Sequence, residues 1–171
     1  KALQLYDSLV NFNDLDTVIL NPILRENREV IFQSRLVESD ILSAILFPEV
    51  IIDSNLYASY KEADLRRSIF YFKGFSGNIN LKASFSGSFF PFSGIAAGEL
   101  FLIKAECMAR AGNYEEALNV LNGFLITRFV TGQFVPYTAS SAEEALNIIL
   151  EERRKELAFR GIRWTDLRRL N

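Results

Sequence analysis

The sequence predicts a mostly α fold, with helices in its second half and short strands and long loops in its first half. Apolar residues recur with a helical period over residues 99–111 and 115–127, on either side of a Gly-Asn dipeptide. A third helix is predicted from a capping box, in which Ser141 is followed three residues later by Glu144. This third helix is expected to continue until Gly161.

The first two of these helices are expected to pack antiparallel, because Gly112 and its neighbour allow only a short turn between them. Small side chains at Ala105 and Ala117 are expected at the contact, since they let two helices approach closely. The helical period also predicts which residues point inward. They are Leu100, Ile103, Cys107 and Ala111 in the first helix, and Ala117, Leu118, Leu121, Phe124 and Leu125 in the second. On this prediction Cys107 is a buried, small apolar residue.

The helix pair resembles one tetratricopeptide unit. The resemblance rests on Ala105, Gly112, Tyr114 and Ala117, which match the pattern Ala, then Gly-x-Tyr-x-x-Ala. One such unit cannot bury its own apolar face, and the sequence contains no second copy of it. The pair is therefore expected to pack on other parts of the polypeptide.

The first half of the chain is predicted to contain short elements. A helix is expected over residues 1–11, and strands are expected over residues 29–33 and 68–73. Asp53 is expected to cap a short helix that runs to Tyr60.

Two further stretches of the first half are less regular. Residues 34–52 are ambiguous, although Ile41, Leu42, Ile45 and Leu46 fit one face of a helix that would end before Pro48. Residues 74–94 are rich in Gly, Ser, Asn and Phe, and are predicted to form a long loop or hairpin.

Composition excludes several classes of function. The 171-residue chain has a net charge of −2, no histidine and one cysteine. These counts exclude an internal disulfide, a Cys/His metal cluster and a Ser-His-Asp triad, so neither a metal nor another cofactor is expected. No apolar run has the length of a membrane-spanning helix. The start of the chain shows no methionine, secretion signal or lipid-acceptor cysteine, and we interpret the chain as the C-terminal portion of a longer protein.

The last twenty-one residues carry seven basic and four acidic side chains. One interpretation is a catalytic pair among Glu151, Glu152, Glu156 and Asp166. The other is a structural network in which these acids pair with the neighbouring bases, and it is preferred because carboxylates among arginines stay ionised. The bases in question are Arg153, Arg154, Lys155, Arg163 and Arg168. Because acids interleave with the bases, this segment does not have the pattern of a nucleic-acid-binding patch.

Three stretches of the sequence are similar to motifs of the SusD/RagB family of cell-surface nutrient-binding lipoproteins. The most specific covers residues 152–169, where the family typically has Glu-Arg-Arg, any residue, Glu-Leu, two apolar residues, Glu-Gly, any residue, Arg-Trp, any residue, Asp-Leu. Residues 98–106 resemble the family's Ala-Glu-x-x-Leu-x-x-Ala-Glu helix, and residues 60–66 resemble its Tyr-x-x-x-Asp-x-Arg. Arg160 departs from the usual Glu, and Gly98 departs from the usual Ala.

The resemblance implies a SusD-like helical fold, with residues 1–97 as a mixed region and residues 98–171 as a helical region of one domain. It also implies that the protein is not an enzyme. It implies a lipid-anchored protein on the outer membrane of Bacteroidetes-type bacteria. Such a protein binds polysaccharide or oligosaccharide nutrients and passes them to a SusC-like TonB-dependent transporter. The motif residues are expected to serve the fold and not the ligand; they are Glu152, Arg153, Arg154, Glu156, Gly161, Arg163, Trp164 and Asp166. Trp164 is accordingly expected to be a buried anchor, although a sugar-stacking ring is the alternative.

Sugar contacts from this chain are predicted in the 74–94 loop and in the segment before it. Aromatic rings offer flat apolar faces to a pyranose, and asparagine amides bond to hydroxyl groups. The candidates are Tyr57, Tyr60, Asn78, Asn80, Phe89, Phe90 and Phe92. The opposing interpretation places the phenylalanines in the core. A helical scaffold that binds protein and has no sugar site is the alternative function, and the length of the non-helical stretch over residues 68–94 argues against it.

Overall fold

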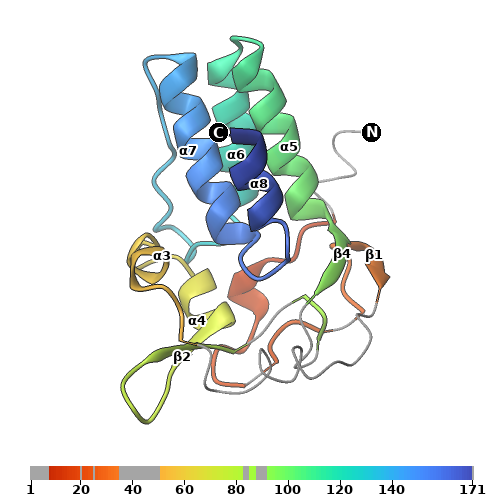
Figure 1. The fold of residues 1–171 in the computed structure, drawn as a ribbon, viewed down its shortest axis with the longest axis vertical. Helices are drawn as coiled ribbons and strands as arrows, with labels where there is room; N and C mark the ends of the chain where they lie inside the picture. Colours follow the sequence, from red (N-terminus) through yellow and green to blue (C-terminus); the bar gives the residue numbers. More distant parts are fainter. Residues whose placement is uncertain are drawn as a thin grey trace.

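A computed structural model describes residues 8–19, 21–24, 26–34, 51–82, 85–87 and 92–170. Three long helices, α5 (Ala97–Arg110), α6 (Tyr114–Leu125) and α7 (Ala142–Glu156), pack side by side, and the short helix α8 (Arg163–Leu170) lies against them (Figure 1). The strands and the short helices of the first half of the chain gather at one end of the long helices (Figure 1). The mostly α fold predicted from the sequence is thereby confirmed.

The α5–α6 hairpin forms as predicted. Ala105 and Ala117 are both fully buried in the core of the helices. The turn contains Gly112 at φ +87°, a conformation that L side chains rarely adopt. The backbone N–H groups of Gly112 and Asn113 then donate to the carbonyl oxygens of Ala109 and Met108, which closes the end of α5.

The inward face predicted for α5 is wrong. Phe101, Leu102, Ala105 and Ala109 are the buried residues. The predicted residues Ile103, Cys107 and Ala111 are exposed, and Leu100 is half-buried. The apolar side chains of α5 point in several directions around the helix axis, so the helical period does not identify which face is buried. The inward face predicted for α6 is confirmed, because Ala117, Leu118, Leu121, Phe124 and Leu125 are all buried.

Helix α7 begins as predicted but ends earlier. Ser141 Oγ accepts a hydrogen bond from the Glu144 N–H at 3.1 Å, whereas the Glu144 carboxylate accepts from the N–H of Ser140 at 2.7 Å. The helix ends at Glu156, five residues before Gly161. Phe159 and Gly161 both have positive φ, at 61° and 76°, and this turn redirects the chain into α8.

The first half of the chain holds a short 3-10 helix, η1 (Phe12–Asp14), and two small antiparallel sheets. Strand β1 (Val30–Ser34) pairs with β4 (Ser93–Ala96), and β2 (Tyr71–Lys73) pairs with β3 (Ile79–Leu81). The β2–β3 hairpin projects away from the helices (Figure 1). The strand predicted over residues 29–33 is confirmed. The hairpin predicted within residues 74–94 is confirmed only in part, because its turn and second strand lie there but its first strand, β2, precedes residue 74.

Two short helices precede the hairpin. Helix α3 (Ser54–Ala58) is capped as predicted, since the Asp53 carboxylate accepts from the Asn55 N–H at 2.9 Å. The strand predicted over residues 68–73 is only partly right: α4 (Arg66–Phe70) occupies its first half. Of the helix predicted over residues 1–11, residues 1–7 lie outside the described residues, and residues 8–11 are not helical. The stretch predicted to be helical before Pro48 also lies outside them.

Apolar side chains form two clusters. One lies among α5, α6 and α7, and the other lies beneath the strands, around Phe12, Ile69, Phe70, Phe85 and Phe92. The polypeptide crosses from one cluster to the other at the C-terminal end of α7. Buried charged side chains gather at this crossing point.

Candidate functional site

Arg66 is the centre of a buried ionic cluster at the end of α7. Its guanidinium lies 2.6 Å from Asp64, 2.7 Å from Glu152 and 3.3 Å from Glu156. All four side chains are at most 1% exposed. In the sequence Arg66 and Glu156 are 90 positions apart, so this cluster joins the first half of the chain to the last helix.

Arg128 extends the same cluster. Its guanidinium lies 2.8 Å from Glu29 and 3.1 Å from Glu156, and it donates to the Val10 carbonyl oxygen at 2.8 Å. The rings of Phe12 and Phe124 lie 4.2 and 4.6 Å from the guanidinium carbon. Arg128 therefore fixes three distant segments to the end of α6.

A second, shallower network attaches α8 to the helices. Asp166 lies 2.9 Å from Arg153 on α7 and 2.8 Å from Arg169 on its own helix. Arg169 also pairs with Glu106 on α5. Glu99, in the first turn of α5, lies 3.9 Å from Arg153. α5, α7 and α8 are therefore joined by charge as well as by apolar contact.

The electrostatic environment lowers the pKa of two acids in these networks, Glu152 and Asp166. Burial alone raises the pKa of Glu152, but Arg66 and Lys155 outweigh burial and hold this pKa below its usual 4.5. Burial likewise opposes the ionisation of Asp166, yet hydrogen bonds from Arg169 and Arg153 lower its pKa. Glu29 differs, because there burial prevails over Arg128 and raises the pKa. A carboxylate held ionised by arginines is poorly suited to act as a general acid.

The structural network predicted for the C-terminal segment is present, but several of its partners are different. Glu152 pairs with Lys155 as predicted, and Asp166 pairs with Arg153. Glu156 instead pairs with Arg66 and Arg128, which come from outside the segment. Among the described residues, Arg154 forms only an exposed pair with Asp53, at 3.0 Å. Glu151, Arg163 and Arg168 are exposed.

The three stretches that resemble the SusD/RagB motifs meet in these networks. Residues 60–66 supply Asp64 and Arg66, and they also supply Tyr60, whose hydroxyl donates to the Lys155 carbonyl oxygen at 2.8 Å. Residues 98–106 supply Glu99 and Glu106. Residues 152–169 supply partners for Arg66, Tyr60, Glu99 and Glu106, whereas Asp64 pairs with Arg66 of its own stretch. The motifs thus describe one connected structure, although they are far apart in the sequence.

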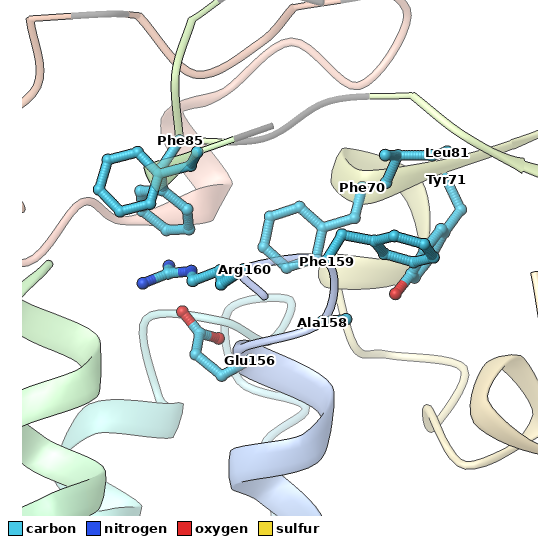
Figure 2. Close-up of a pocket in the computed structure, with 9 residues that line it drawn as sticks. Phe70, Tyr71, Leu81, Phe85, Glu156, Ala158, Phe159 and Arg160 are labelled. Carbon is cyan, nitrogen blue, oxygen red and sulfur yellow. The ribbon is translucent and has the colours of Figure 1, made fainter. Parts of the chain in front are cut away.

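Both departures from the motif pattern lie next to Glu156. A Cβ at Gly98 would lie 3.2 Å from Glu156 Oε1 and 3.1 Å from the Phe124 ring, so glycine relieves a tight contact. Arg160 lies over the rings of Phe85 and Phe92, with its guanidinium carbon 4.4 and 5.1 Å from their centroids. Figure 2 shows this guanidinium beside Phe85, with the Glu156 carboxylate near it.

Arg160 lines a small, aromatic-walled cavity (Figure 2). Its two terminal nitrogens are buried, and no described residue accepts a hydrogen bond from them. Burial lowers the pKa of Arg160, against the opposing effect of Glu156. The free volume is about 10 Å³, room for about one water molecule. The cavity is therefore part of the core and is too small for a sugar ring.

Several predicted sugar contacts are withdrawn, because the structure buries them. Tyr60 is 3% exposed and Phe92 is 2% exposed, so neither ring offers a face to a ligand. Asn80 is also buried. Tyr60 lies between the hairpin and the ionic cluster, since its hydroxyl lies 2.9 Å from that of Tyr71 and donates to the Lys155 carbonyl oxygen.

The remaining candidates differ in position. Asn78 is exposed at the end of the β2–β3 hairpin, and Tyr57 is half-buried, with the Arg67 guanidinium carbon 4.7 Å from its ring centroid. Phe89 and Phe90 lie outside the described residues. Sequence reasoning missed Phe75, which is fully exposed at the hairpin end. The sequence could have indicated this position, since Gly74 and Gly77 on either side of Phe75 predict a tight turn.

Trp164 was predicted to be a buried anchor, and this prediction is wrong. Its side chain is 71% exposed on the outer surface of α8. Asp166, two residues later, turns inward and holds the helix in its place. Ion pairs, and not the tryptophan ring, therefore anchor this helix to the described part of the chain.

The described residues contain neither a metal-binding cluster nor a membrane-spanning helix. No group of three or more His, Cys, Asp or Glu side chains there has the arrangement of a metal site. In the same part of the chain no helix has both the length and the apolar character needed to cross a bilayer.

Comparisons with known proteins agree with the motif pattern. The sequence model of the SusD family matches residues 64–171. The fold is similar to that of a SusD-like carbohydrate-binding protein from Bacteroides vulgatus ATCC 8482, with a TM-score of 0.63 and 19% sequence identity. The similarity covers 90% of this chain and 36% of that protein, so the chain spans about a third of its relative's length. No curated protein matches the chain in sequence.

Proposed function

Because the chain belongs to the SusD family, we propose that it takes part in binding polysaccharide or oligosaccharide nutrients at the cell surface. The observation that carries this proposal is the family match over residues 64–171, whose motif side chains meet in the buried cluster around Arg66 and in the network that attaches α8. The carbohydrate-binding relative of similar fold supports the same activity.

The proposed binding needs neither a covalent step nor a cofactor. Aromatic rings pack against the apolar faces of sugar rings, and amide side chains form hydrogen bonds with hydroxyl groups. Of the residues predicted from the sequence, Asn78 and Tyr57 keep an accessible surface. The acidic side chains of the C-terminal motif stabilise the fold, since Glu152, Glu156 and Asp166 are all engaged by cations. We therefore propose a binding protein and not an enzyme.

We further propose that the bound glycan passes to a SusC-like TonB-dependent transporter, and that the whole protein is lipid-anchored at the outer membrane of a Bacteroidetes-type bacterium. In this proposal residues 1–171 form the C-terminal portion of a SusD-like domain, divided into a mixed region (1–97) and a helical region (98–171). Family membership supports all three statements.

A glycan array tests the binding activity directly. We expect the protein to bind a subset of polysaccharide fragments, and calorimetry on the strongest ligand should give a saturable isotherm without turnover. The absence of binding to any glycan would contradict the proposal. Co-purification with a TonB-dependent transporter from the native membrane tests the partner.

An alternative function, a helical scaffold that binds protein, is favoured by one observation. Ile103 and Cys107 on α5, and Trp164 and Leu167 on α8, expose apolar surface on the outside of the helices. Such surface is typical of protein contacts. The array separates the two functions, because a scaffold of this kind would bind no glycan.

A further inference from the structure

The β2–β3 hairpin carries a fully exposed aromatic ring at its end. Phe75 has a relative exposure of 116%, the largest among the exposed apolar side chains of the described residues. Leaving a phenylalanine ring in water forgoes the stabilisation that burial gives. The ring is thus accessible to a ligand on both of its faces.

The turn that carries Phe75 is held in one conformation. The Gly74 N–H donates to the Asn78 carbonyl oxygen at 2.8 Å, and the Gly77 N–H donates to the Gly74 carbonyl oxygen at 3.0 Å. Gly77 has φ +85°, which favours glycine. A Cβ at Gly74 would lie 2.8 Å from Asn80 Oδ1, so the buried Asn80 side chain packs against the turn.

The base of the hairpin is fixed to the ionic cluster. Tyr71 in β2 is buried, and its hydroxyl lies 2.9 Å from that of Tyr60, which in turn donates to the Lys155 carbonyl oxygen. The Ile52 N–H donates to the Ile79 carbonyl oxygen at 2.8 Å along the other strand. A rigid base holds the exposed end in place, which lowers the entropic cost of binding there.

The stretch of sequence that contains the turn carries charge of one sign. Residues 65–98 contain four basic side chains and no aspartate or glutamate, although the whole chain has a net charge of −2. Arg66 is neutralised in the ionic cluster, and Lys82 is buried, where it donates to the carbonyl oxygens of Thr17 and Ser68. Lys73 is exposed, and its Cε lies 4.0 Å from where a Cβ of Gly77 would stand, so its side chain reaches the turn.

We propose that residues 73–78 bind a sugar residue that carries a carboxylate or sulfate group. The sugar ring packs on Phe75, the Asn78 amide forms a hydrogen bond with a hydroxyl group, and the Lys73 ammonium pairs with the acidic group. The inference rests on the proposed glycan-binding function and names the class of glycan and the residues that contact it. A membrane surface is a weaker fit, since one ring and one amine give too little contact for stable membrane binding.

An array of neutral, uronate-containing and sulfated oligosaccharides provides the first test. We expect the acidic members to dominate the bound set, with affinity that falls as salt is raised. Binding to neutral members alone would overturn the assignment of the acidic class. Binding to none of them would overturn the proposed function itself, which distinguishes the two failures.

Variants at the turn provide the second test, measured by calorimetry on the strongest ligand. Phe75→Ala should lower affinity about tenfold, as expected for a lost ring contact. Lys73→Gln should lower it about fivefold at low salt and remove most of the salt dependence. The matched controls are Val135→Ala and Lys104→Gln, which change other exposed residues and should leave affinity unchanged.

Two results would refute the assignment of the turn. The first is an affinity of Phe75→Ala and Lys73→Gln within twofold of the unmodified protein, with unchanged melting temperatures. The second is co-sedimentation of the unmodified protein with phosphatidylcholine–phosphatidylserine vesicles that is lost in Phe75→Ala, which would make the turn a membrane contact. All four substituted side chains are exposed, so loss of folding should not obscure the comparison.

Discussion

Replacing Arg66 by methionine removes the cation that three buried carboxylates share. Asp64, Glu152 and Glu156 lie within 3.3 Å of this guanidinium and are almost completely shielded from water. Breaking a buried ion pair by removing one partner costs about 3–5 kcal/mol, because it leaves uncompensated charge in the interior. For a chain of this size such a loss lowers the melting temperature by roughly 6–20 °C.

The loss should depend on pH in a defined direction. In the unmodified protein the folded-state pKa of Glu152 lies below 4.5, so its stabilising contribution is present above that pH and is lost as pH falls through the folded pKa. Without Arg66 the pKa of Glu152 rises, and protonation relieves the repulsion. The stability difference between Arg66→Met and the unmodified protein should therefore shrink between pH 7 and pH 5.

Urea unfolding at these two pH values measures both effects. Arg154→Met is the control, since Arg154 pairs with Asp53 at 3.0 Å but both side chains are 40% or more exposed. An exposed pair contributes at most about 1 kcal/mol. Equal losses in the two variants, or a loss from Arg66→Met that is the same at both pH values, would refute the buried-cluster argument.

Four further substitutions test other parts of the structure. Asp166→Asn should lower the free energy of unfolding by about 1–3 kcal/mol in urea and leave glycan affinity unchanged, because Asp166 only attaches α8. Gly112→Ala should cost about 1–2 kcal/mol by the same measurement, since φ is +87° there and no atom would obstruct the new methyl group. Tyr60→Phe should cost about 1 kcal/mol in urea unfolding, because its hydroxyl donates to the Lys155 carbonyl oxygen inside the protein. Arg160→Met should be neutral or raise the melting temperature, since the buried nitrogens of Arg160 have no acceptor among the described residues. A loss of more than about 2 kcal/mol in the free energy of unfolding would indicate that Arg160 has a partner.

Local hydrogen bonds explain which elements could be predicted from the sequence. The caps at Asp53 and Ser141 join residues two or three positions apart, and the turn at Gly112 needs only its own backbone conformation. Such signals are complete within a short stretch of sequence. The end of α7 could not be predicted in this way, because Phe159 adopts the left-handed conformation that the sequence suggested only for Gly161.

Burial could not be predicted wherever an element has two candidate faces. In α5 the pairs Leu100 and Ile103, and Phe101 and Leu102, are similarly apolar, so only the packing partner decides between the faces. Trp164 illustrates the same limit, since its type predicts burial but the side chain is exposed. Apolar character alone does not specify which neighbour a side chain meets.

The ionic partners could be predicted only in part. The C-terminal segment indicated a network, yet Arg128 and Glu29, which are 99 positions apart, carry no local pattern that would pair them. Their pairing depends on the fold that brings the segment after α6 to the segment before β1. A single sequence contains the charges of such a pair but not their distance.

The separation between buried network and exposed turn determines how mutational effects should be interpreted. Tyr60 links the two, because its hydroxyl contacts both Tyr71 at the base of the hairpin and the Lys155 carbonyl oxygen at the end of α7. A change in the network can therefore displace the hairpin and weaken binding without any contact to the ligand. Changes at the exposed end have no such path to the core. Loss of affinity identifies a contact residue only where the melting temperature is unchanged, and Phe75 and Lys73 allow that comparison while Tyr60 and Arg66 do not.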